Sequence, residues 1–374
     1  MKADAIGLYV HIPFCLKKCN YCDFCSFDSF DKDTRKSYIS SLIKEIKSYE
    51  RDEKIAVDTI FFGGGTPSLL ESHEFESIVI AIRKTFSVSE DCEFTVEVNP
   101  KTASTEKMLF FKNQGVNRIS IGLQTIHENE RKILGRIHCF QDFSDAYSSA
   151  IESSISNVSV DVMYGIPEQT KESFMKTLEF AINHNPSHIS VYGLILEEDT
   201  RFWDLRDKLS LPSEDDECEM YYAACEYLKA RGYSHYEISN YSKPGFESRH
   251  NLKYWKNESY IGVGISAYSY FEGHRYGNTK NMSEYLSKDK AQYISDDVID
   301  RETCSFEYAM LALRLNEGIS LSEYKQKFGC DFISSRENKI REYIEYGYMM
   351  KTDDRLFLTE KGFYVSNTIL SELL

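Results

Sequence analysis

Apolar runs and amphipathic segments alternate through the first half of the chain. Six apolar runs are rich in strand-forming residues, and the segments between them carry apolar side chains at helical spacing. In residues 31–49, for example, Tyr38, Leu42 and Ile46 fall on one helix face. The pattern predicts strands at residues 5–12, 57–62, 94–98, 118–121, 158–163 and 188–194. It predicts helices at residues 31–49, 72–86, 104–114, 127–134, 142–153 and 171–183.

Six strand–helix repeats predict a parallel sheet, which is either open or curled into a partial (β/α)6 barrel. The positions of the conspicuous motifs favour the barrel, because each lies at or just after the carboxyl end of a predicted strand. Barrel enzymes build their active sites at this end of the strands. The motifs are the cysteine-rich loop after residue 12, Gly63-Gly64-Gly65, Glu97, Gln124, Asp161 and Tyr192.

The pattern changes after residue 197. A helix is predicted at residues 214–231, and the apolar, glycine-spaced stretch at residues 261–271 should pack closely against another segment. From residue 305 onward the chain predicts three helices, a hairpin at residues 349–358 and a final helix, which together resemble a winged-helix module. We therefore expect an α/β protein with three parts: a partial barrel over residues 1–210, a small α+β connecting region over 211–300, and the winged-helix-like module over 301–374.

The composition and charge narrow the possible partners. The chain has 374 residues and a net charge of −15, which argues against nucleic-acid binding because phosphate contacts need a basic surface. The N-terminal apolar stretch is too short for a signal peptide, and no run approaches the length of a transmembrane helix. Ten cysteines without a secretory signal favour a reducing compartment in which thiols bind metals. We therefore expect a cytoplasmic protein that has no transmembrane segment and binds no nucleic acid.

Four of the ten cysteines fall within eleven residues of the segment YVHIPFCLKKCNYCDFCSF, residues 9–27. Cys15, Cys19 and Cys22 have the spacing C-x3-C-x2-C, and Cys25 follows three residues later. Thiolates this close together are typical of iron–sulfur or zinc ligands, and the lysines at positions 17 and 18 should favour the ionised form. Structural zinc sites usually combine two separated cysteine pairs, and the chain has no such second pair. The spacing predicts that three cysteines hold three irons of a [4Fe–4S] cluster, whose fourth iron stays open to a small molecule.

The other strand-end motifs indicate what that small molecule could be. The three glycines expose backbone groups to a ligand, but they match neither a P-loop nor a dinucleotide-binding fingerprint. Glu97, Arg136 and Asp161 follow successive strands, and at one barrel mouth they could bind a ribose and a carboxylate. Arg136 is the natural carboxylate partner, because a guanidinium binds it through two parallel hydrogen bonds.

Taken together, the motifs resemble those of radical S-adenosylmethionine proteins of the HemN/HemW group. This group comprises the oxygen-independent coproporphyrinogen oxidases and their heme-chaperone relatives. The matching segments span residues 9–255, and the C-terminal module also resembles that of the group. In chain order the segments are YVHIPFCLKKCNYCDF, FFGGGTPS, EVNP, RISIGLQT, LGRIH, DVMYGIP, HISVYGL and RHNLKYW.

The resemblance implies roles for individual residues. Cys15, Cys19 and Cys22 would ligate the [4Fe–4S] cluster, and S-adenosylmethionine would chelate the fourth iron through its amino and carboxylate groups. The protein would position the cofactor and exclude water. The residues that match S-adenosylmethionine contacts of the group are Tyr9, Tyr21, Gly64, Gly65, Thr66, Glu97, Gln124, Arg136 and Asp161.

Two departures distinguish the branches of the group. The decarboxylating oxidases carry a fourth cysteine at the position of Phe24, whereas the heme-chaperone branch does not, so Cys25 is expected to be a free thiol. The RHNLKYW segment resembles the H-N-x-x-Y-W element linked to heme binding, in which histidine is an established axial ligand and aromatic rings can stack on a macrocycle. The residues of this element are His250, Asn251, Tyr254 and Trp255.

The sequence therefore favours a heme chaperone that carries a [4Fe–4S] cluster and S-adenosylmethionine and passes bound heme to an acceptor protein. The same histidine in an aromatic core could instead have a packing role. Two enzymatic alternatives remain open. The first is oxidative decarboxylation of coproporphyrinogen III to protoporphyrinogen IX, and the second is another radical reaction on a tetrapyrrole. The partners under these hypotheses are heme or a porphyrinogen, together with a heme acceptor or an electron donor that the sequence does not identify.

Overall fold

Six parallel strands in chain order form the core of the protein. The computed structural model describes residues 5–287 and 293–374; residues 1–4 and 288–292, which fall within the expected ranges 1–210 and 211–300, lie outside the described residues. Each strand pairs in parallel with the next one in the chain, so the predicted parallel sheet is confirmed. The strands are β1 (Ile6–Ile12), β2 (Ala56–Gly64), β3 (Ser87–Val98), β4 (Arg118–Gln124), β5 (Asn157–Tyr164) and β6 (His188–Gly193).

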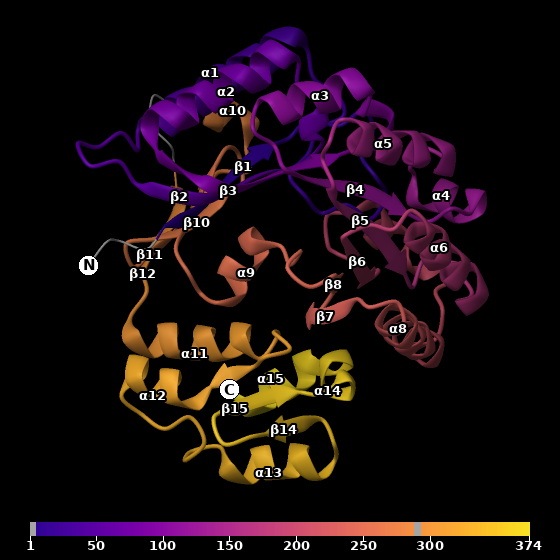
Figure 1. The fold of residues 1–374 in the computed structure, drawn as a ribbon, viewed down its shortest axis with the longest axis vertical. Helices are drawn as coiled ribbons and strands as arrows, with labels where there is room; N and C mark the ends of the chain where they lie inside the picture. The colour runs from indigo at the N-terminus through magenta and orange to yellow at the C-terminus, as the bar shows by residue number, and fades with distance from the viewer. Residues whose placement is uncertain (1–4, 288–292) are drawn as a thin grey trace.

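The connecting helices cover the convex side of this curved sheet, as Figure 1 shows. In the first helix, the apolar face that the sequence predicted is buried, and Asp31 caps the N-terminus by accepting a hydrogen bond from the Thr34 amide. Ser104 caps the third helix in the same way, by accepting a hydrogen bond from the Lys107 amide. The helices are α1 (Lys32–Lys47), α2 (Ser72–Thr85), α3 (Thr105–Asn113), α4 (Glu128–Leu134), α5 (Phe140–Glu152) and α6 (Lys171–Asn183).

The region after β6 extends the barrel sheet at both of its edges. Strand β8 (Asn240–Ser242) pairs antiparallel with β6, and β7 (Ser234–Glu237) pairs antiparallel with β8 at the outer edge. Strand β9 (Tyr260–Val263) returns to pair in parallel with β1. An antiparallel meander of β10 (Tyr268–Phe271), β11 (His274–Asn278) and β12 (Tyr293–Val298) follows β9. The twelve strands have the order β12-β11-β10-β9-β1-β2-β3-β4-β5-β6-β8-β7. The helices of this region are α7 (Arg201–Leu205), α8 (Glu214–Lys229), α9 (Arg249–Trp255) and α10 (Met282–Leu286).

The glycine-spaced stretch at residues 261–271 packs closely, as the sequence predicted. A side chain at Gly262 would overlap the carbonyl oxygen of Tyr268, because β9 and β10 fold tightly back on each other there. Helix α9 lies on the concave side of the sheet, where it contacts β2 (Figure 1). No helix among the described residues is both long enough and apolar enough to cross a lipid bilayer.

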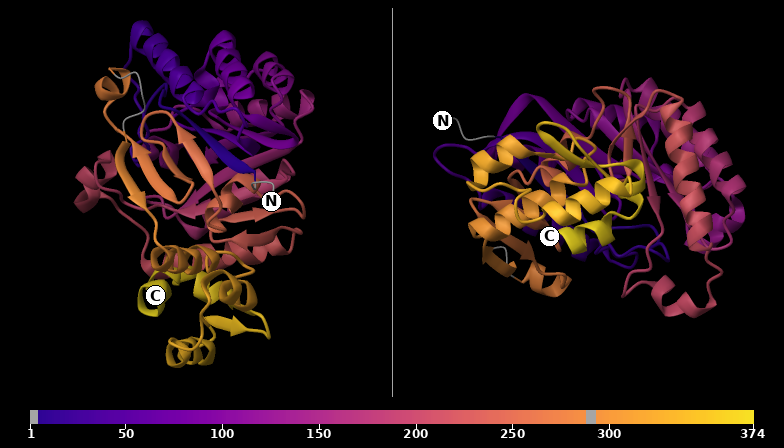
Figure 2. Two further views of the ribbon diagram at one scale, coloured as in Figure 1. Left: turned by 90° about the vertical axis from the view of Figure 1, so that its left-hand side faces the viewer. Right: turned by 90° about the horizontal axis from the view of Figure 1, so that it is seen from below.

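The C-terminal module lies below the barrel and contacts α9 through its first helix (Figures 1 and 2). It contains the three helices and the hairpin of the predicted winged arrangement, but two short helices follow the hairpin where one was predicted. The hairpin strands and β13 form a small sheet of order β13-β15-β14. Its elements are α11 (Arg301–Ala312), β13 (Ile319–Ser320), α12 (Leu321–Phe328), α13 (Glu337–Glu345), β14 (Met349–Lys351), β15 (Arg355–Leu358), α14 (Glu360–Tyr364) and α15 (Ser366–Leu373).

Candidate functional site

Two adjoining cavities open inside the barrel. The first, which we call the cysteine cavity, has a volume of about 160 Å³. It brings together the three predicted cluster ligands and every predicted S-adenosylmethionine contact except Tyr9. Its lining includes Cys15, Cys19, Cys22, Tyr21, Gly64, Gly65, Thr66, Glu97, Gln124, Arg136 and Asp161. The motifs at the strand ends therefore meet in one cavity, as expected if the strands form a partial barrel.

The second, which we call the inner cavity, has a volume of about 450 Å³ and extends into the barrel. Its walls come from alternate residues of β4, β5 and β6, whose side chains point to the same face because successive strand residues point to opposite faces. Tyr21, Cys22, Phe24, Glu97, Ser120, Asp161 and Tyr192 line both cavities. A ligand in the inner cavity would therefore lie next to the cysteine-rich loop.

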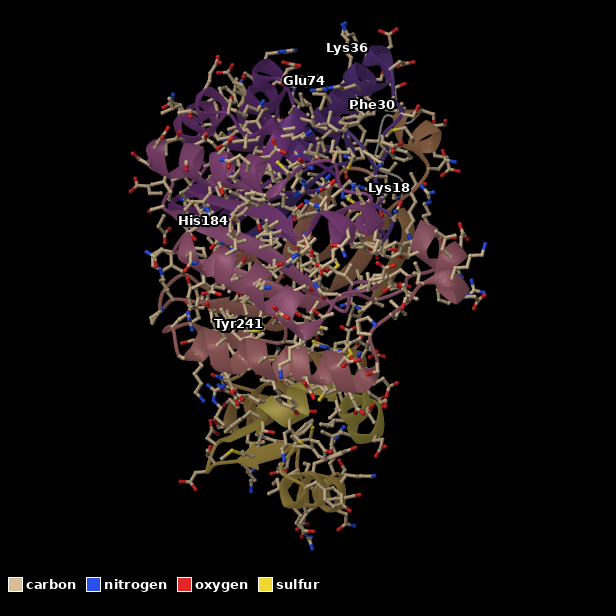
Figure 3. All side chains as sticks on the ribbon, turned by 90° about the vertical axis from the view of Figure 1, so that its right-hand side faces the viewer. Lys18, Phe30, Lys36, Glu74, His184 and Tyr241 are labelled. Carbon is tan, nitrogen blue, oxygen red and sulfur yellow. The ribbon has the colours of Figure 1, made fainter. Side chains whose placement is uncertain are left out.

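The cysteine-rich loop, which Lys18 marks in Figure 3, is held by backbone hydrogen bonds. The Cys15 amide donates to the Phe27 carbonyl at 2.9 Å, and the Thr66 amide donates to the Phe14 carbonyl at 2.8 Å. Gly64 has a φ of 105°, and a side chain there would overlap the His11 ring. The glycines therefore permit the loop after β2 to lie directly against the cysteine-rich loop.

The three cysteines share one cavity, in which burial and a nearby lysine act in opposite directions on two of the thiols. Burial raises the pKa of Cys15 and raises that of Cys22 to about 11. Lys18 favours the ionised form of both thiols, as the sequence predicted, but desolvation outweighs the nearby charge. Within the described ranges, no three His, Cys, Asp or Glu side chains stand close enough to share one metal ion.

The geometry fits an iron–sulfur cluster better than a single ion. In a cubic cluster each thiolate binds a different iron, so the three sulfurs need not converge on one point. Thr66 donates a hydrogen bond from Oγ1 to the Cys15 sulfur at 3.7 Å, and such bonds are one means by which a protein tunes a cluster. The donor set of three cysteines at the mouth of the barrel thus suits the predicted [4Fe–4S] cluster.

Arg136 is fixed in the cysteine cavity by three hydrogen bonds. Its Nη1 donates to the Tyr21 hydroxyl at 2.9 Å, its Nη2 to the Gly122 carbonyl at 2.8 Å, and its Nε to His138 at 3.2 Å. Gln124 lies beside it with a left-handed φ of 68° and accepts a hydrogen bond from the Tyr192 hydroxyl at 2.7 Å. The guanidinium is therefore held in one orientation, which suits recognition of a carboxylate.

Glu97 and Asp161 are the two carboxyl groups of the cavity wall. Burial, with Asp161 as the next largest influence, raises the pKa of Glu97 to about 8, although a 3.2 Å hydrogen bond from the Gly64 amide opposes this. Burial also raises the pKa of Asp161, against hydrogen bonds from Ser120 and Ser190. Side chains of this kind can bond to ribose hydroxyls, since they accept and, when protonated, also donate hydrogen bonds.

The H-N-x-x-Y-W element lies on α9, and most of its residues line neither cavity. His250 is 1% exposed, and its two ring nitrogens bond to the Thr59 hydroxyl at 2.9 Å and the Tyr254 hydroxyl at 2.8 Å. Its ring stacks on Phe61 with a centroid distance of 5.2 Å, and burial lowers its pKa to about 3. Only Asn251 of the element lines the inner cavity.

Tyr9 and Trp255 likewise line neither cavity. The Tyr9 hydroxyl bonds to the His11 ring at 3.0 Å, and its ring lies 6.2 Å from that of Phe61, which lines the inner cavity. Tyr9 therefore packs against lining residues without lining either cavity itself.

The inner cavity also contains polar residues that the motif analysis did not identify. Arg118, Ser159, His188 and Ser190 come from the first part of their strands, so they lie deeper than the strand-end motifs. The signal that could have found them is the alternation of polar residues along β4, β5 and β6, for example His188, Ser190 and Tyr192.

Comparison with known proteins places the chain in a family. Residues 9–181 match the radical SAM superfamily, and residues 299–365 match the HemN C-terminal domain. The chain is 35% identical over 369 residues to the heme chaperone HemW of Lactococcus lactis, covering 98% of this chain and 96% of that protein. It is 32% identical over 377 residues to the heme chaperone HemW of Escherichia coli, covering 99% and 98%.

A more distant relative and a solved structure agree with this result. The zebrafish protein "radical S-adenosyl methionine domain-containing protein 1, mitochondrial" is 31% identical, covering 98% of this chain and 86% of that protein. The structure of coproporphyrinogen III oxidase (HemN) from Escherichia coli matches with a TM-score of 0.84, covers 98% of this chain and 89% of the other, and shares 21% identity. This last match concerns the fold alone.

The chain therefore belongs to the HemW family within the radical S-adenosylmethionine superfamily. The resemblance and the α/β radical SAM fold expected from the sequence are both confirmed. Membership of the superfamily implies a [4Fe–4S] cluster and S-adenosylmethionine as cofactors.

Proposed function

We propose that this protein is a heme chaperone, which binds heme beside a [4Fe–4S] cluster with S-adenosylmethionine and passes the heme to an acceptor protein. The observation that carries the proposal is Phe24, which stands where the decarboxylating oxidases have a fourth cysteine. Its side chain is 58% exposed and lines both cavities, so an apolar ring faces the space that a substrate or cargo would enter. The name heme chaperone HemW of the relatives from Lactococcus lactis and Escherichia coli supports the same function.

The cofactor site follows from the residues of the cysteine cavity. Cys15, Cys19 and Cys22 would hold the cluster, and the fixed Arg136 would bind the carboxylate of S-adenosylmethionine. Glu97 and Asp161 would bond to the ribose hydroxyls. When bound, these cofactors supply radical chemistry at the mouth of the barrel. The surrounding walls would exclude water from the space between the two cavities.

We infer that the heme enters the inner cavity, because this cavity adjoins Phe24 and is the larger of the two. Helix α9 would form part of its wall through Asn251. Axial ligation of heme by His250, which the resemblance implies, would require His250 to give up its hydrogen bonds to Thr59 and Tyr254. Stacking on Tyr254 or Trp255 would require α9 to move.

The second candidate function is oxygen-independent oxidation of coproporphyrinogen III. The likeness to the oxidase HemN extends over 98% of this chain and supports a similar barrel and C-terminal module. A substrate with four carboxylate arms could enter the same inner cavity. The two functions differ in whether the bound tetrapyrrole is changed.

An anaerobic experiment separates the two. The protein is reconstituted with iron and sulfide, given S-adenosylmethionine and a one-electron reductant, and incubated either with coproporphyrinogen III or with heme and a heme-free acceptor protein. We expect stoichiometric heme binding and transfer, with no porphyrinogen turnover. Formation of vinyl-containing product would overturn the chaperone proposal. A Cys19→Ser variant controls for transfer that does not need the cluster.

A further inference from the structure

An unpaired arginine lies deep in the inner cavity. Arg118, the first residue of β4, is 2% exposed and lines this cavity. Its Nε has no hydrogen-bond partner among the described residues, and none of their carboxylates lies within ion-pair distance of its guanidinium. A buried charge without partners is costly, so its retention calls for an explanation.

The groups around Arg118 do not neutralise it. The guanidinium acts electrostatically on Glu97 and Asp161, yet burial raises the pKa of both carboxyls despite it. It also acts on His188 and His250, but their ring nitrogens already bond to hydroxyl groups. The donors of the guanidinium are therefore left for a group that comes from outside.

The entrance of the inner cavity has the opposite character. Phe24 is 58% exposed and Ile195 is 67% exposed, and both line this cavity. Large apolar side chains exposed at the rim of a pocket commonly mark a binding site. The exposed Asp23 and Glu197 also line the cavity, so the apolar patch formed by Phe24 and Ile195 has acidic neighbours. An apolar patch at the entrance and a buried guanidinium further inside suit a ligand with a flat apolar body and an acidic arm.

We propose that Arg118 binds a carboxylate arm of a tetrapyrrole, whose macrocycle rests against the apolar patch formed by Phe24 and Ile195. The tetrapyrrole part of this inference rests on the proposed function, whereas selection of a carboxylate follows from Arg118 itself. The guanidinium would donate two parallel hydrogen bonds to the carboxylate, as arginine does in buried recognition sites. No residue of the H-N-x-x-Y-W element is needed for this contact.

The test compares hemin with its dimethyl ester, in which both carboxylates are blocked but the macrocycle and iron are unchanged. Affinities are measured by absorbance titration of the reconstituted protein in the same detergent for both ligands. We expect the wild type to prefer hemin by on the order of thirtyfold, the effect of a buried charge pair. Arg118→Gln should remove the preference by weakening hemin binding alone, and Arg118→Lys should restore part of it.

Arg231→Gln is the matched control, because it removes the same charge at an exposed position outside both cavities. It should keep the full preference for hemin. Equal binding of hemin and its ester by the wild type, or an unchanged preference in Arg118→Gln, would overturn the inference and leave heme binding intact. Absence of binding to either ligand would overturn the proposed function as well. Should Arg118→Gln fail to fold, an unchanged preference in Arg118→Lys would equally contradict the inference.

Discussion

The inner cavity and helix α9 both contain histidine, tyrosine and charged groups, but they differ in how many of their polar atoms have hydrogen-bond partners. Around α9, Glu93 accepts the backbone amides of Arg249 and His250 at 3.0 Å each, and both ring nitrogens of His250 are bonded. In the inner cavity, the Arg118 Nε has no partner among the described residues. The Ser120 hydroxyl lies 3.3–3.4 Å from the oxygens of Asp161, which also accepts a hydrogen bond from Ser190.

This difference in hydrogen bonding is the one expected between a packed polar network, such as that around α9, and a binding site, such as the inner cavity. A network whose donors and acceptors are all paired contributes to stability and leaves little capacity for a ligand. Unpaired donors that face open space cost stability until a ligand satisfies them. On this basis we propose that the ligand binds in the barrel interior and that α9 is a structural support.

Of the substitutions considered, the largest effect is expected for loss of a cluster ligand in the cysteine cavity. Cys19→Ser should abolish the cluster, because a serine hydroxyl does not replace a thiolate ligand of iron. Iron content and the brown absorbance of the reconstituted protein measure the result. Cys25→Ser, three residues beyond the last ligand, is the control and should retain the cluster. A Cys19→Ser protein with full iron would refute the assignment.

On the α9 side, His250→Ala should lower the free energy of unfolding by about 3–5 kcal/mol. The substitution removes a buried ring and leaves a cavity against Phe61. It also leaves the buried hydroxyls of Thr59 and Tyr254 without their hydrogen-bond partner. Urea unfolding of the purified protein measures the change. His73→Ala, at an exposed position, should change stability little. A small loss in His250→Ala would indicate that α9 is not a structural support and would favour a ligand role.

The pH dependence of stability tests the cavity wall. Because the folded-state pKa of Glu97 is raised from 4.5 to about 8, the folded protein keeps a proton that the unfolded chain releases. Stability should therefore fall as the pH rises from about 4.5 to 8, and Asp161, whose pKa is also raised, should add to the trend.

Glu97→Gln removes one of these titrating groups and keeps a hydrogen-bond acceptor for the Gly64 amide. We expect it to be more stable than the wild type by about 1–2 kcal/mol at pH 8.5, with the difference shrinking toward pH 5. Thermal unfolding at a series of pH values measures this. Parallel pH profiles for the two proteins would show that Glu97 does not titrate in this range.

The smallest effect is expected from Tyr254→Phe. It removes only the hydroxyl that bonds to His250 Nε2 at 2.8 Å, so the free energy of unfolding should fall by about 1 kcal/mol. Heme affinity should not change if heme binds in the inner cavity. Tighter heme binding in this variant would mean that freeing Nε2 helps ligation, and it would assign the axial ligand to His250.

Much of the fold and the cofactor site could be predicted before the structure. The alternation of apolar runs and amphipathic segments is a local signal, and it located the six consecutive parallel strands of the barrel, β1–β6. The strand β3 nevertheless begins at Ser87 rather than at residue 94, because its first half is polar and partly exposed. The cysteines, Glu97, Gln124, Arg136 and Asp161 were found because each lies at a strand end or in a dense motif, and parallel strands bring their ends together.

Tertiary structure alone decided three things. It paired β9 with β1 and β8 with β6, because such short strands form only where a neighbouring strand offers its free edge. It placed His250 against Thr59, which is 191 residues away in the sequence. Histidine is a common metal ligand, but here its ring is packed and hydrogen-bonded. The tertiary structure also buried the Arg118 Nε with no hydrogen-bond partner among the residues that the structure describes. The sequence by itself determined which side chains can ligate a metal, carry a charge or form hydrogen bonds. Only the folded chain determined which of these groups remain unpaired, since pairing depends on contacts between distant segments.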